Sequence, residues 1–408
     1  MADFFVMDDF DLAGKTVYLR VDINSPINPI TGEIMGTDRF KAHVDTVRRL
    51  RESKVVIVAH QSRPGKDDFT SLKQHAQVFS HLIGKKITFV DQLFGSRVNE
   101  EISSMSNGDV MMLENSRFYS EEVDLNSIDL MEKSNIVKNL TPMFDYFIID
   151  AFAAIHRAQT TLVGFKRMKP NIAGSLIERE VTMVDKFRNF KDRPKIAILG
   201  GSKIDDSIAV SENFLSTSAV DRILTGGVVG NIFAWASGID IGKKNREFIM
   251  KNNPDYEKLL EKCRNVLSRY RDKVMIPEDF IMNPSGRRIY VNGKLPDDET
   301  VGDIGIDTVV RYSEEIENAR AIFMNGPMGI YEIDEYSTGT REIMSAMAHS
   351  NAFRIAGGGH TLSALDMMGL TDSIDHASTG GGALISYLSG ESMPVLEALK
   401  ESKKMFEE

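Results

Sequence analysis

Short runs of β-branched and aliphatic residues recur along the whole chain, separated by longer stretches with helical periodicity. The runs predict strands at 17–21, 55–58, 110–113, 147–149, 196–199 and 321–324. Helical patterns lie between them, for example at 40–50 and 71–83. Strands that alternate with helices form parallel sheets covered by helices on both faces. The sequence therefore predicts an α/β fold.

The length of the chain predicts two domains. It has 408 residues, whereas single hydrophobic cores stop growing at roughly 250 to 300 residues. We expect two Rossmann-like domains, each a parallel sheet with helices on both faces, joined by a hinge helix that the pattern near 175–190 predicts. The predicted segments are a first domain at 1–174, an inter-domain helix at 175–192, a second domain at 193–385 and a C-terminal segment at 386–408. The last helix, near 393–406, can belong to either domain.

Composition excludes several classes of protein. With 42% hydrophobic and 26% charged residues, the chain is neither disordered nor fibrous. A formal net charge of -10 argues against nonspecific nucleic-acid binding. The single cysteine, Cys263, is expected to be a small buried hydrophobe. The uncharged run between Arg222 and Asp240 is interrupted by glycines and predicts a strand, a loop and a buried helix rather than a membrane span.

Charged and polar side chains follow each predicted strand of the first half. They are Arg20, Asp22 and Asn24 after the first strand, His60 and Arg63 after the second, Arg117 after the third, and Asp150, His156 and Arg157 after the fourth. Open α/β sheets bind ligands at the carboxyl ends of their strands. A lone arginine there is more often a salt-bridge partner, but five arginines, with Arg39 near the first helix, predict a small, multiply anionic substrate. A phosphorylated carboxylic acid fits this description.

Glycine-rich segments follow the predicted strands of the second half. They lie at 200–203, 225–227, 325–329, 357–361 and 379–382. Any one of them can be a tight turn that needs glycine for its backbone conformation. Five beside strand ends favour a nucleotide, because such loops let backbone N–H groups approach phosphates. No GxxxxGK[ST] and no full GxGxxG occurs, which argues against a P-loop enzyme and against a nicotinamide dehydrogenase.

Nine motifs then occur in the order of a known family. They are RVDINSP (20–26), AHQSRPG (59–65), MLENSRF (112–118), DAFAAIHRA (150–158), LGGSKIDD (199–206), LTGGVVGN (224–231), MNGPMG (324–329), AGGGHT (356–361) and STGGG (378–382). Together they resemble the phosphoglycerate kinase family from end to end. The short length and the histidine of GGGHT are similar to its archaeal branch.

This resemblance implies reversible phosphoryl transfer from 1,3-bisphosphoglycerate to ADP, giving 3-phosphoglycerate and ATP in glycolysis and gluconeogenesis. It implies that phosphoglycerate is held by Asp22, Ile23, Asn24, Arg39, His60, Gln61, Ser62, Arg63, Arg117 and Arg157. It implies that the nucleotide is held by Gly201, Lys203, Gly226, Gly227, Asn325, Glu332, Gly358, Gly359, His360 and Thr361, with Glu332 on the ribose. Arg39 and Lys203, one from each domain, are the expected catalytic residues.

The chain departs from the family pattern at two positions. Bacterial and eukaryotic relatives carry a second lysine where this chain has Ser207, and an aspartate that helps to position Mg²⁺ where it has His360. We expect Mg²⁺ to be bound largely through ATP or ADP oxygens and water, and the sequence names no protein ligand for it.

The reaction is expected to be an in-line transfer after domain closure, with no general base, because the leaving carboxylate needs no proton. We expect a cytoplasmic monomer or homodimer that binds neither nucleic acid nor membrane, since the acidic N-terminus is unlike a signal peptide. Three alternatives remain open. They are a two-domain sensor that has lost turnover, a nicotinamide dehydrogenase with a degenerate glycine loop, and a kinase for a different carboxylate.

Overall fold

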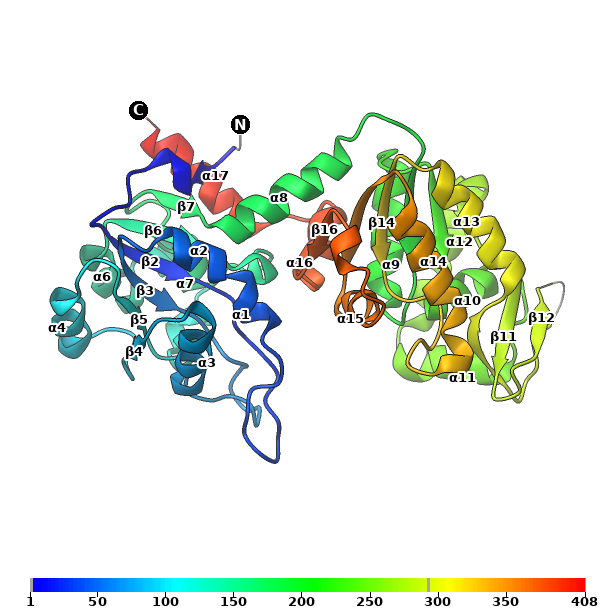
Figure 1. Cartoon of the computed structure of the whole chain (residues 1–408), viewed down its shortest axis with the longest axis horizontal. Coiled ribbons are helices and arrows are strands. Elements are labelled where there is room, and N and C mark those ends of the chain that lie inside the picture. Colours follow the sequence, from blue (N-terminus) through cyan, green and yellow to red (C-terminus); the bar gives the residue numbers. More distant parts are fainter. Residues whose placement is uncertain (1–2, 292–293, 408) are drawn as a thin grey trace. The chain divides into compact units, whose positions relative to one another are not determined.

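The computed structural model describes residues 3–291 and 294–407, so the outermost limits of the predicted segments, residues 1 and 408, lie outside the described part. Contacts within the chain define two compact units: unit 1 is Met1–Thr182 with Ser392–Glu408, and unit 2 is Met183–Glu391. The chain passes from unit 1 to unit 2 inside helix α8 (Ser175–Arg188) (Figure 1).

Unit 1 is built on a seven-stranded sheet with the order β1-β7-β6-β2-β3-β5-β4, in which all neighbours are parallel. The strands are β1 (Phe5–Val6), β2 (Thr16–Arg20), β3 (Lys54–Val58), β4 (Ile87–Phe89), β5 (Val110–Met112), β6 (Tyr146–Ile149) and β7 (Asn171–Ala173). The helices are α1 (Asp38–Ala42), α2 (Val44–Arg49), α3 (Lys73–Ile83), α4 (Ser96–Ser104), α5 (Ile128–Glu132), α6 (Asn135–Leu140), α7 (Thr160–Val163) and α17 (Pro394–Phe406). The last of these contacts β7, α7 and β1, so the C-terminal helix packs on unit 1.

Both faces of the unit 1 sheet are buried, because successive side chains of a strand point to opposite faces. Leu19 of β2 packs in a core with Phe40 of α1 and Phe79 of α3. Its neighbour Tyr18 packs instead against Phe165, with ring centroids 5.1 Å apart. Because both faces of the sheet are buried, its strands are continuous apolar runs in the sequence.

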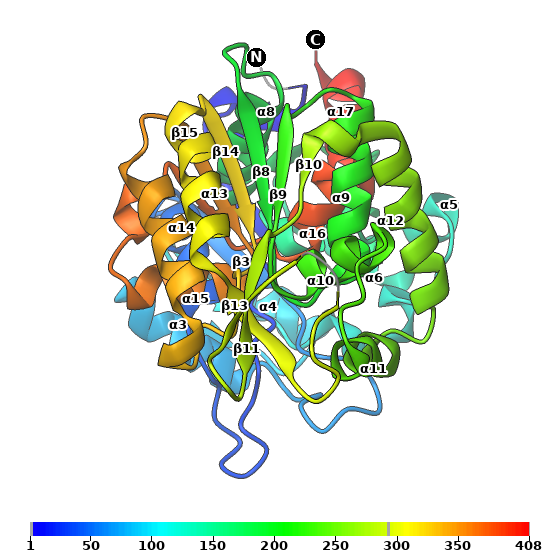
Figure 2. The ribbon, with the colours of Figure 1, turned by 90° about the vertical axis from the view of Figure 1, so that its right-hand side faces the viewer.

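Unit 2 is built on a six-stranded parallel sheet with the order β10-β9-β8-β14-β15-β16. Its strands are β8 (Lys195–Leu199), β9 (Arg222–Thr225), β10 (Val274–Met275), β14 (Ala321–Asn325), β15 (Phe353–Gly357) and β16 (His376–Ser378). Its helices are α9 (Ile204–Ser216), α10 (Gly227–Ala236), α11 (Lys243–Asn252), α12 (Tyr256–Tyr270), α13 (Ile306–Asn318), α14 (Thr338–His349), α15 (Gly359–Met367) and α16 (Gly382–Leu388). Figure 2 shows α13 and α14 on one side of this sheet and α9 and α12 on the other. The predicted α/β fold is confirmed.

A second, antiparallel sheet in unit 2 was not predicted. It consists of β11 (Asp279–Asn283), β12 (Arg288–Tyr290) and β13 (Thr300–Ile304), with β11 in the middle. Its edge strand β12 has only three residues and is largely exposed, so it lacks the longer buried apolar run by which the predicted strands were found.

Three further sequence predictions have a clear outcome. The helix predicted at 40–50 is interrupted, because α1 ends and α2 begins at His43, which has φ -99° and ψ -4°. The run between Arg222 and Asp240 is a strand, a turn and a buried helix, as predicted. Cys263 is buried, and burial raises the pKa of its thiol to about 12, so a structural role is confirmed. Among the described residues, no helix is both long and apolar enough to cross a bilayer.

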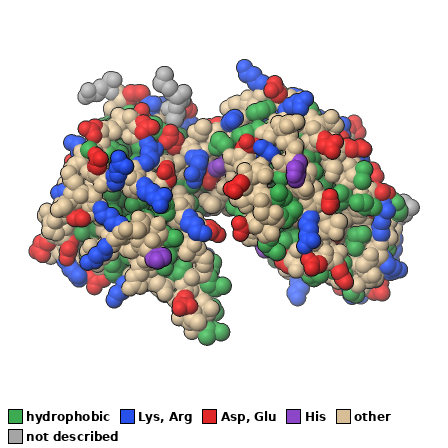
Figure 3. Space-filling model, viewed as in Figure 1, with side chains coloured by type: hydrophobic (Ala, Val, Ile, Leu, Met, Phe, Trp, Pro, Cys, Tyr) green, Lys and Arg blue, Asp and Glu red, His purple; other side chains and the backbone are tan. Residues whose placement is uncertain are grey.

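The loop at 25–37, between β2 and α1, projects from unit 1 (Figures 1 and 2). Ile30 in this loop is 93% exposed and Met35 is 54% exposed. Hydrophobic side chains are visible at the tip of this projection in Figure 3.

Candidate active site

Each parallel sheet reverses its strand order at one point, and the predicted site residues follow the strands there. In unit 1 the order reverses at β2, which lies between β3 and β6. In unit 2 it reverses at β8, which lies between β9 and β14. Because ligands of open α/β sheets bind beside such a reversal, each unit has one favoured position for a ligand.

Asp22, two residues beyond β2, is the acidic centre of the unit 1 group. Its side chain is 5% exposed, and Oδ2 lies 3.0 Å from Nη1 of Arg39. Oδ1 accepts a hydrogen bond of 3.1 Å from the backbone N–H of Asn24. Burial alone would raise the pKa of this carboxyl, but the charge of Arg39, the Asn24 N–H and the charge of Arg20 hold it well below its ordinary value. Asp22 is therefore ionised at neutral pH and orients the partly exposed guanidinium of Arg39.

His60 follows β3 and is fully buried, with its two ring nitrogens in different surroundings. Nδ1 lies 3.0 Å from Nη2 of Arg20, and because a guanidinium can only donate, the ring proton is on Nε2. Burial lowers the pKa of His60 well below its ordinary value; nearby Asp22 opposes this, and the charge of Arg20 adds to it. Among the described residues, Nε2 has no hydrogen-bond partner. His60 is therefore a neutral imidazole with one N–H available for a ligand.

Arg20, the last residue of β2, is fully buried and contacts His60 at Nδ1 of the ring. Its Nε donates to Oγ1 of Thr161 at 2.8 Å, and its Nη2 lies 3.6 Å from Oε1 of Glu122, which is also fully buried. Burial of an ion pair costs desolvation free energy, and hydrogen bonds to both partners help to offset that cost. The sequence placed Arg20 at a strand end but gave no signal for Glu122.

The segment after β3 brings Gln61 and Ser62 into the same group. Ser62 has φ 54°, in the left-handed region that residues other than glycine seldom adopt. Its N–H donates to Oδ1 of Asn24 at 2.9 Å, and its carbonyl accepts from Nη1 of Arg117. The buried Gln61 side chain instead bonds to both backbone groups of Ser25. Ser62 thus joins the ends of β2, β3 and β5, and strained backbone of this kind clusters at ligand sites.

The remaining arginines differ in how well they are tied to this group. Burial, together with the charges of Arg157 and Arg20, lowers the pKa of Arg117 to about 10, so these three cations lie near one another. Arg63 is exposed, and no contact with another described residue ties its side chain to them. Ile23 lies in the hydrophobic core, so only its backbone can face a ligand.

A pocket of 180 Å³ lies in unit 2 where its strand order reverses. Its lining includes four predicted residues, Gly201, Gly227, Glu332 and His360. It also includes Val228, Val301 and Ile330, which give it an apolar wall, and Asn231, whose buried Oδ1 has no partner among the described residues. Sequence reasoning assigned none of these last four residues, although Val228 and Asn231 belong to the LTGGVVGN motif.

Glycine is required where the loops around this pocket meet. The N–H of Gly201 donates to the carbonyl of Pro327, and that of Gly227 donates to the carbonyl of Met328, both at 2.7 Å. A Cβ on Gly200 would lie 2.2 Å from the Pro327 oxygen, and one on Gly227 would lie 2.7 Å from the nitrogen of Gly201. Gly226 also faces Met328. The pocket is therefore shaped by backbone in close contact, which no larger residue would permit.

The ends of β14 and β15 bring Asn325, Gly358 and Thr361 together. Oγ1 of the buried Thr361 accepts from the N–H of Gly326 at 2.7 Å. A Cβ on Gly358 would lie 2.4 Å from Oδ1 of Asn325. Gly359 is exposed and begins α15, whose first N–H groups suit a phosphate.

Lys203 and Ser207 lie at the start of the segment that follows β8 but differ in exposure. Lys203 is exposed and immediately precedes α9. Ser207, one turn later, is 1% exposed, and its Oγ has no hydrogen-bond partner among the described residues. Of the two positions, only Lys203 can present a charge to a ligand.

Glu332 and His360 face each other at the rim of the pocket. Glu332 Oε1 lies 3.7 Å from His360 Nδ1, and the side chains are 55% and 73% exposed. Across the described residues, no group of three or more His, Cys, Asp or Glu side chains could hold a metal ion. The side chains that face each other at this rim are one carboxylate and one imidazole.

Comparisons with known proteins cover both units. A sequence model of the family described as phosphoglycerate kinase matches residues 7–391. The phosphoglycerate kinase of Thermoplasma acidophilum is 74% identical over 407 residues, and 100% of each chain is covered. That of Methanothermus fervidus is 43% identical over 406 residues, with 99% of this chain and 98% of the relative covered. The crystal structure of phosphoglycerate kinase from Pyrococcus horikoshii OT3 has a TM-score of 0.89 to this structure, at 41% sequence identity. The match covers 98% of this chain and 100% of the Pyrococcus chain.

Proposed function

This chain belongs to the phosphoglycerate kinase family, and from that premise we propose that unit 1 binds the phosphoglycerate and unit 2 the nucleotide. As a phosphotransferase of this family, the chain transfers a phosphoryl group reversibly between 1,3-bisphosphoglycerate and ADP, a step of glycolysis. The resemblance to the archaeal branch is confirmed by the same relatives. The assignment of individual residues to each substrate is our proposal.

The observation that carries the phosphoglycerate assignment is the cationic group beside the strand-order reversal of unit 1. Arg20, Arg117 and Arg157 lie near a neutral His60, and Arg39 pairs with Asp22, in a chain whose formal net charge is -10. Burial and the neighbouring cations lower the pKa of Arg117, and an anion bound between these cations would offset their mutual repulsion. Asn24 and Asp22 complete the site, and Asp22 can accept from a substrate hydroxyl. Arg63, which is exposed, contributes from the rim.

The nucleotide assignment is supported by the backbone construction of the unit 2 pocket. The apolar wall of Val228, Val301 and Ile330 suits a flat base, and Glu332 at the rim suits the ribose hydroxyls. The glycine loops at 200–203 and 357–361 offer N–H groups to the phosphates, with Lys203 beside them.

The chemistry that we propose is in-line phosphoryl transfer, in which the protein positions the groups and stabilises charge. Arg39 from unit 1 and Lys203 from unit 2 neutralise the transferring phosphoryl group. No side chain acts as a general base, because the acyl phosphate leaves as a carboxylate. The neutral His60 accordingly donates a hydrogen bond and exchanges no proton.

Magnesium fits this site only as a partner of the nucleotide. The rim offers the single carboxylate of Glu332 beside His360, and Mg²⁺ in kinases commonly keeps several waters and binds one or two carboxylates together with substrate phosphates. We propose that Glu332 and the loop at 357–361 orient the metal-bound nucleotide. The ion itself supplies charge neutralisation on the phosphates.

Because the two proposed sites belong to different units, we propose that the units close on each other during catalysis. Closure would bring Arg39 to the nucleotide's terminal phosphate and exclude water from the acyl phosphate. Small-angle scattering should show a smaller radius of gyration with both ligands bound than with either alone. An unchanged radius would remove closure from the mechanism.

The central test is a coupled assay. ATP consumption with 3-phosphoglycerate and Mg²⁺, linked through glyceraldehyde-3-phosphate dehydrogenase to loss of NADH, should proceed in the wild type and be abolished in Arg39→Ala. A folded wild type that binds both ligands without turnover would favour the sensor alternative, with Ser207 and His360 as the cause. The expected cytoplasmic location is a separate proposal, tested by cell fractionation.

A further inference from the structure

Helices α1 and α2 form a nearly continuous segment that touches both the proposed phosphoglycerate site and the start of α8. Arg39, His43, Thr46 and Arg49 are spaced by four, three and three residues. Residues three apart share one face of a helix, so Thr46 and Arg49 lie on one face of α2, and His43 immediately precedes that helix. Arg39 contacts Asp22, as described above. His43 and Thr46 contact Asp150, and Arg49 contacts the first turn of α8.

His43, at the junction of the two helices, bridges two aspartates that lie in different parts of unit 1. It is 1% exposed, and its Nδ1 lies 2.9 Å from Oδ2 of Asp150. A carboxylate can only accept, so Nδ1 carries the proton. Nε2 lies 3.2 Å from both the backbone nitrogen and the backbone oxygen of Asp22. One imidazole ring thus joins the backbone of Asp22 to the carboxylate of Asp150.

Asp150, immediately after β6 and fully buried, satisfies the first turn of α8. The first N–H groups of a helix have no partner within it. Here Oδ1 of Asp150 accepts from the N–H of Leu176 at 2.8 Å, while Oδ2 accepts from Oγ1 of Thr46 at 2.6 Å. A Cβ on Gly174 would lie 2.3 Å from Oδ1, so the chain can approach this closely only with glycine.

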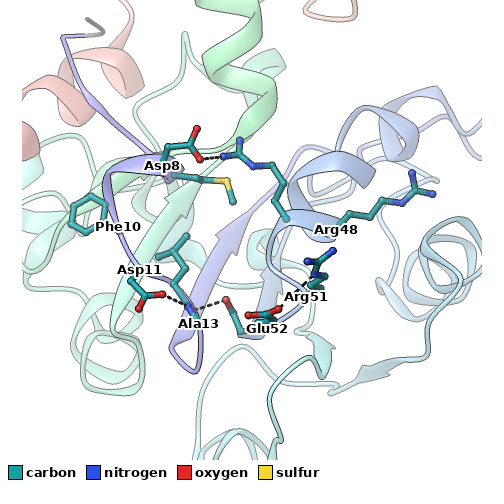
Figure 4. Close-up of a pocket in the computed structure, with 11 residues that line it drawn as sticks. Asp8, Phe10, Asp11, Ala13, Arg48, Arg51 and Glu52 are labelled. Atoms are coloured by element: carbon teal, nitrogen blue, oxygen red, sulfur yellow. Dashed lines mark hydrogen bonds and ion pairs between the residues drawn. The ribbon is translucent and has the colours of Figure 1, made fainter.

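Arg49 holds the same turn of α8 from the end of α2. Its Nη1 donates to Oγ of Ser175 at 3.0 Å and lies 3.9 Å from Oε2 of Glu178, while Nη2 pairs with Asp8. The next residue back, Arg48, is exposed and points away from Asp8 in Figure 4. We call the exposed side of α2 that carries Arg48 its free face, to distinguish it from the side on which Arg49 contacts α8.

We propose that His43 is a positioning residue for the phosphoglycerate site, which couples the Asp22 backbone through Asp150 to the first turn of α8. The inference rests on the proposed role of Asp22 and Arg39 in binding phosphoglycerate. A ligand that fixes Asp22 and Arg39 also fixes His43, and the ordered Asp150 carboxylate then holds the N–H groups of α8 more firmly. Since α8 is the segment in which the chain leaves unit 1, the effect of substrate reaches the helix that leads to the nucleotide unit.

Hydrogen exchange of the full-length chain, measured by mass spectrometry, tests this coupling. Addition of saturating 3-phosphoglycerate alone should slow exchange in a peptide covering 174–180 by about fivefold or more, the lower end of ordinary coupling between sites. Calorimetry on the same samples gives the Kd of 3-phosphoglycerate. Failure to bind would overturn the proposed function, whereas binding without protection of 174–180 would overturn the coupling alone.

Two substitutions of His43 each cut the bridge at one end. In His43→Asn the amide can replace Nδ1 and keep the bond to Asp150, but it cannot reach Asp22. In His43→Gln the amide can replace Nε2 and keep the bond to Asp22, but it loses Asp150. Both variants should still bind 3-phosphoglycerate, more weakly than the wild type, and both should lose the ligand-induced protection of 174–180. Arg48→Gln, on the free face of α2, should retain the ligand-induced protection of 174–180.

A purely structural His43 would lower thermal stability and leave the protection at saturating ligand unchanged, so full protection in either His43 variant would overturn the proposal. If both variants fail to fold, Thr46→Val carries the test, because it removes the second donor to Asp150 and nearly preserves shape. Reduced protection in Thr46→Val would support the coupling, and unchanged protection would refute it.

Discussion

The two proposed sites use the same position in the same kind of sheet but are built from different parts of the chain. In unit 1, charged side chains from four strand ends surround Asp22, and they hold one another through ion pairs and hydrogen bonds. In unit 2, glycine loops meet through backbone hydrogen bonds around an apolar pocket. The contrast follows from the ligands: a small anion is best held by cations, whereas a nucleotide needs a slot for its base and N–H groups for its phosphates.

Two buried aspartates, one in each unit, differ in pKa, and this difference allows the contrast between the sites to be measured. Asp22 has cations beside it, which hold its pKa well below the ordinary value. Asp303 of β13, beside the unit 2 pocket, accepts hydrogen bonds from two backbone N–H groups, those of Gly339 at 2.6 Å and Ile304 at 2.9 Å. Burial therefore raises its pKa to about 7, despite these two hydrogen bonds. A buried carboxyl is ionised in unit 1 and close to half protonated at neutral pH in unit 2.

The largest effect is expected from Arg39→Ala. Removing a group that stabilises transition-state charge costs about 10²- to 10³-fold in kcat, and the Kd of ADP should not change, because Arg39 belongs to unit 1. Steady-state kinetics and nucleotide titration measure the two quantities. Arg48→Ala removes an equal charge from the free face of α2 and should have near wild-type kinetics. A comparable loss in Arg48→Ala would show that overall charge, rather than the site, is responsible.

A smaller effect is expected from His60→Ala. A hydrogen bond to a charged group contributes about 1.5–3 kcal/mol, so the Kd of 3-phosphoglycerate should rise roughly 10- to 100-fold. His60→Gln can place an amide N–H near the position of Nε2 and should recover part of the affinity. Calorimetry at neutral pH distinguishes the variants. Equal affinity in wild type and His60→Ala would place the ligand away from this ring.

Gly200→Ala tests the backbone construction of unit 2. The added Cβ would lie 2.2 Å from the carbonyl oxygen of Pro327, and overpacking of this kind costs about 1–3 kcal/mol. Unit 2 should melt earlier, and ADP should bind more weakly, while 3-phosphoglycerate binding is kept. Gly359→Ala is the matched control, because nothing lies within 4 Å of a Cβ there. Calorimetric melting curves with and without ADP distinguish the two variants. Identical curves would show that the loops shift to accommodate the added methyl group.

Asp303→Asn is expected to change the pH dependence of stability. In the folded chain this carboxyl keeps its proton up to about pH 7, whereas in the unfolded chain it loses it near pH 4. Between these values the folded state binds more protons, so Asp303 makes stability fall as pH rises, by at most about 1.4 kcal/mol per pH unit. Asp303→Asn should remove this contribution, as measured by urea unfolding across that interval. An unchanged slope would show that Asp303 is ionised in the folded state.

Asp22 should act with the opposite sign. Its pKa is lowered on folding, so its contribution to stability is present above the unfolded value and is lost as pH falls below it. Asp22→Asn should therefore lower stability at neutral pH and make stability fall less steeply as pH is lowered on the acid side. An unchanged acid-side slope would contradict the cationic surroundings assigned to Asp22.

The parts of the fold that the sequence predicted are those with a strong local signal. The six apolar runs were found because their strands are buried on both faces, and the glycine loops were found through their motifs. The sheet of β11, β12 and β13 was missed because β12 is short and exposed, and because Asp279 in β11 and Asp303 in β13 interrupt the apolar pattern. The break at His43 was missed because apolar periodicity continues across it, and only the contacts of the ring with Asp22 and Asp150 explain it.

Within the candidate site, strand-end position indicated the residues that share an edge, but long-range partners stayed hidden. Glu122 supports Arg20 across a large sequence separation, and nothing near it in the sequence marks it as part of this group. Asn231 was passed over within a quoted motif because the glycines explained that motif. Conversely, Arg63 looked equivalent to Arg117 in the sequence, yet the structure leaves it exposed, because position after a strand does not fix where a long side chain lies.

Calorimetric titration of Arg39→Ala and Gly200→Ala with 3-phosphoglycerate and with ADP tests the division between the two sites most directly. We predict a crossed pattern, in which Arg39→Ala weakens only 3-phosphoglycerate and Gly200→Ala weakens only ADP. Loss of ADP binding in Arg39→Ala with 3-phosphoglycerate binding intact would contradict the assignment of the substrates to the two units.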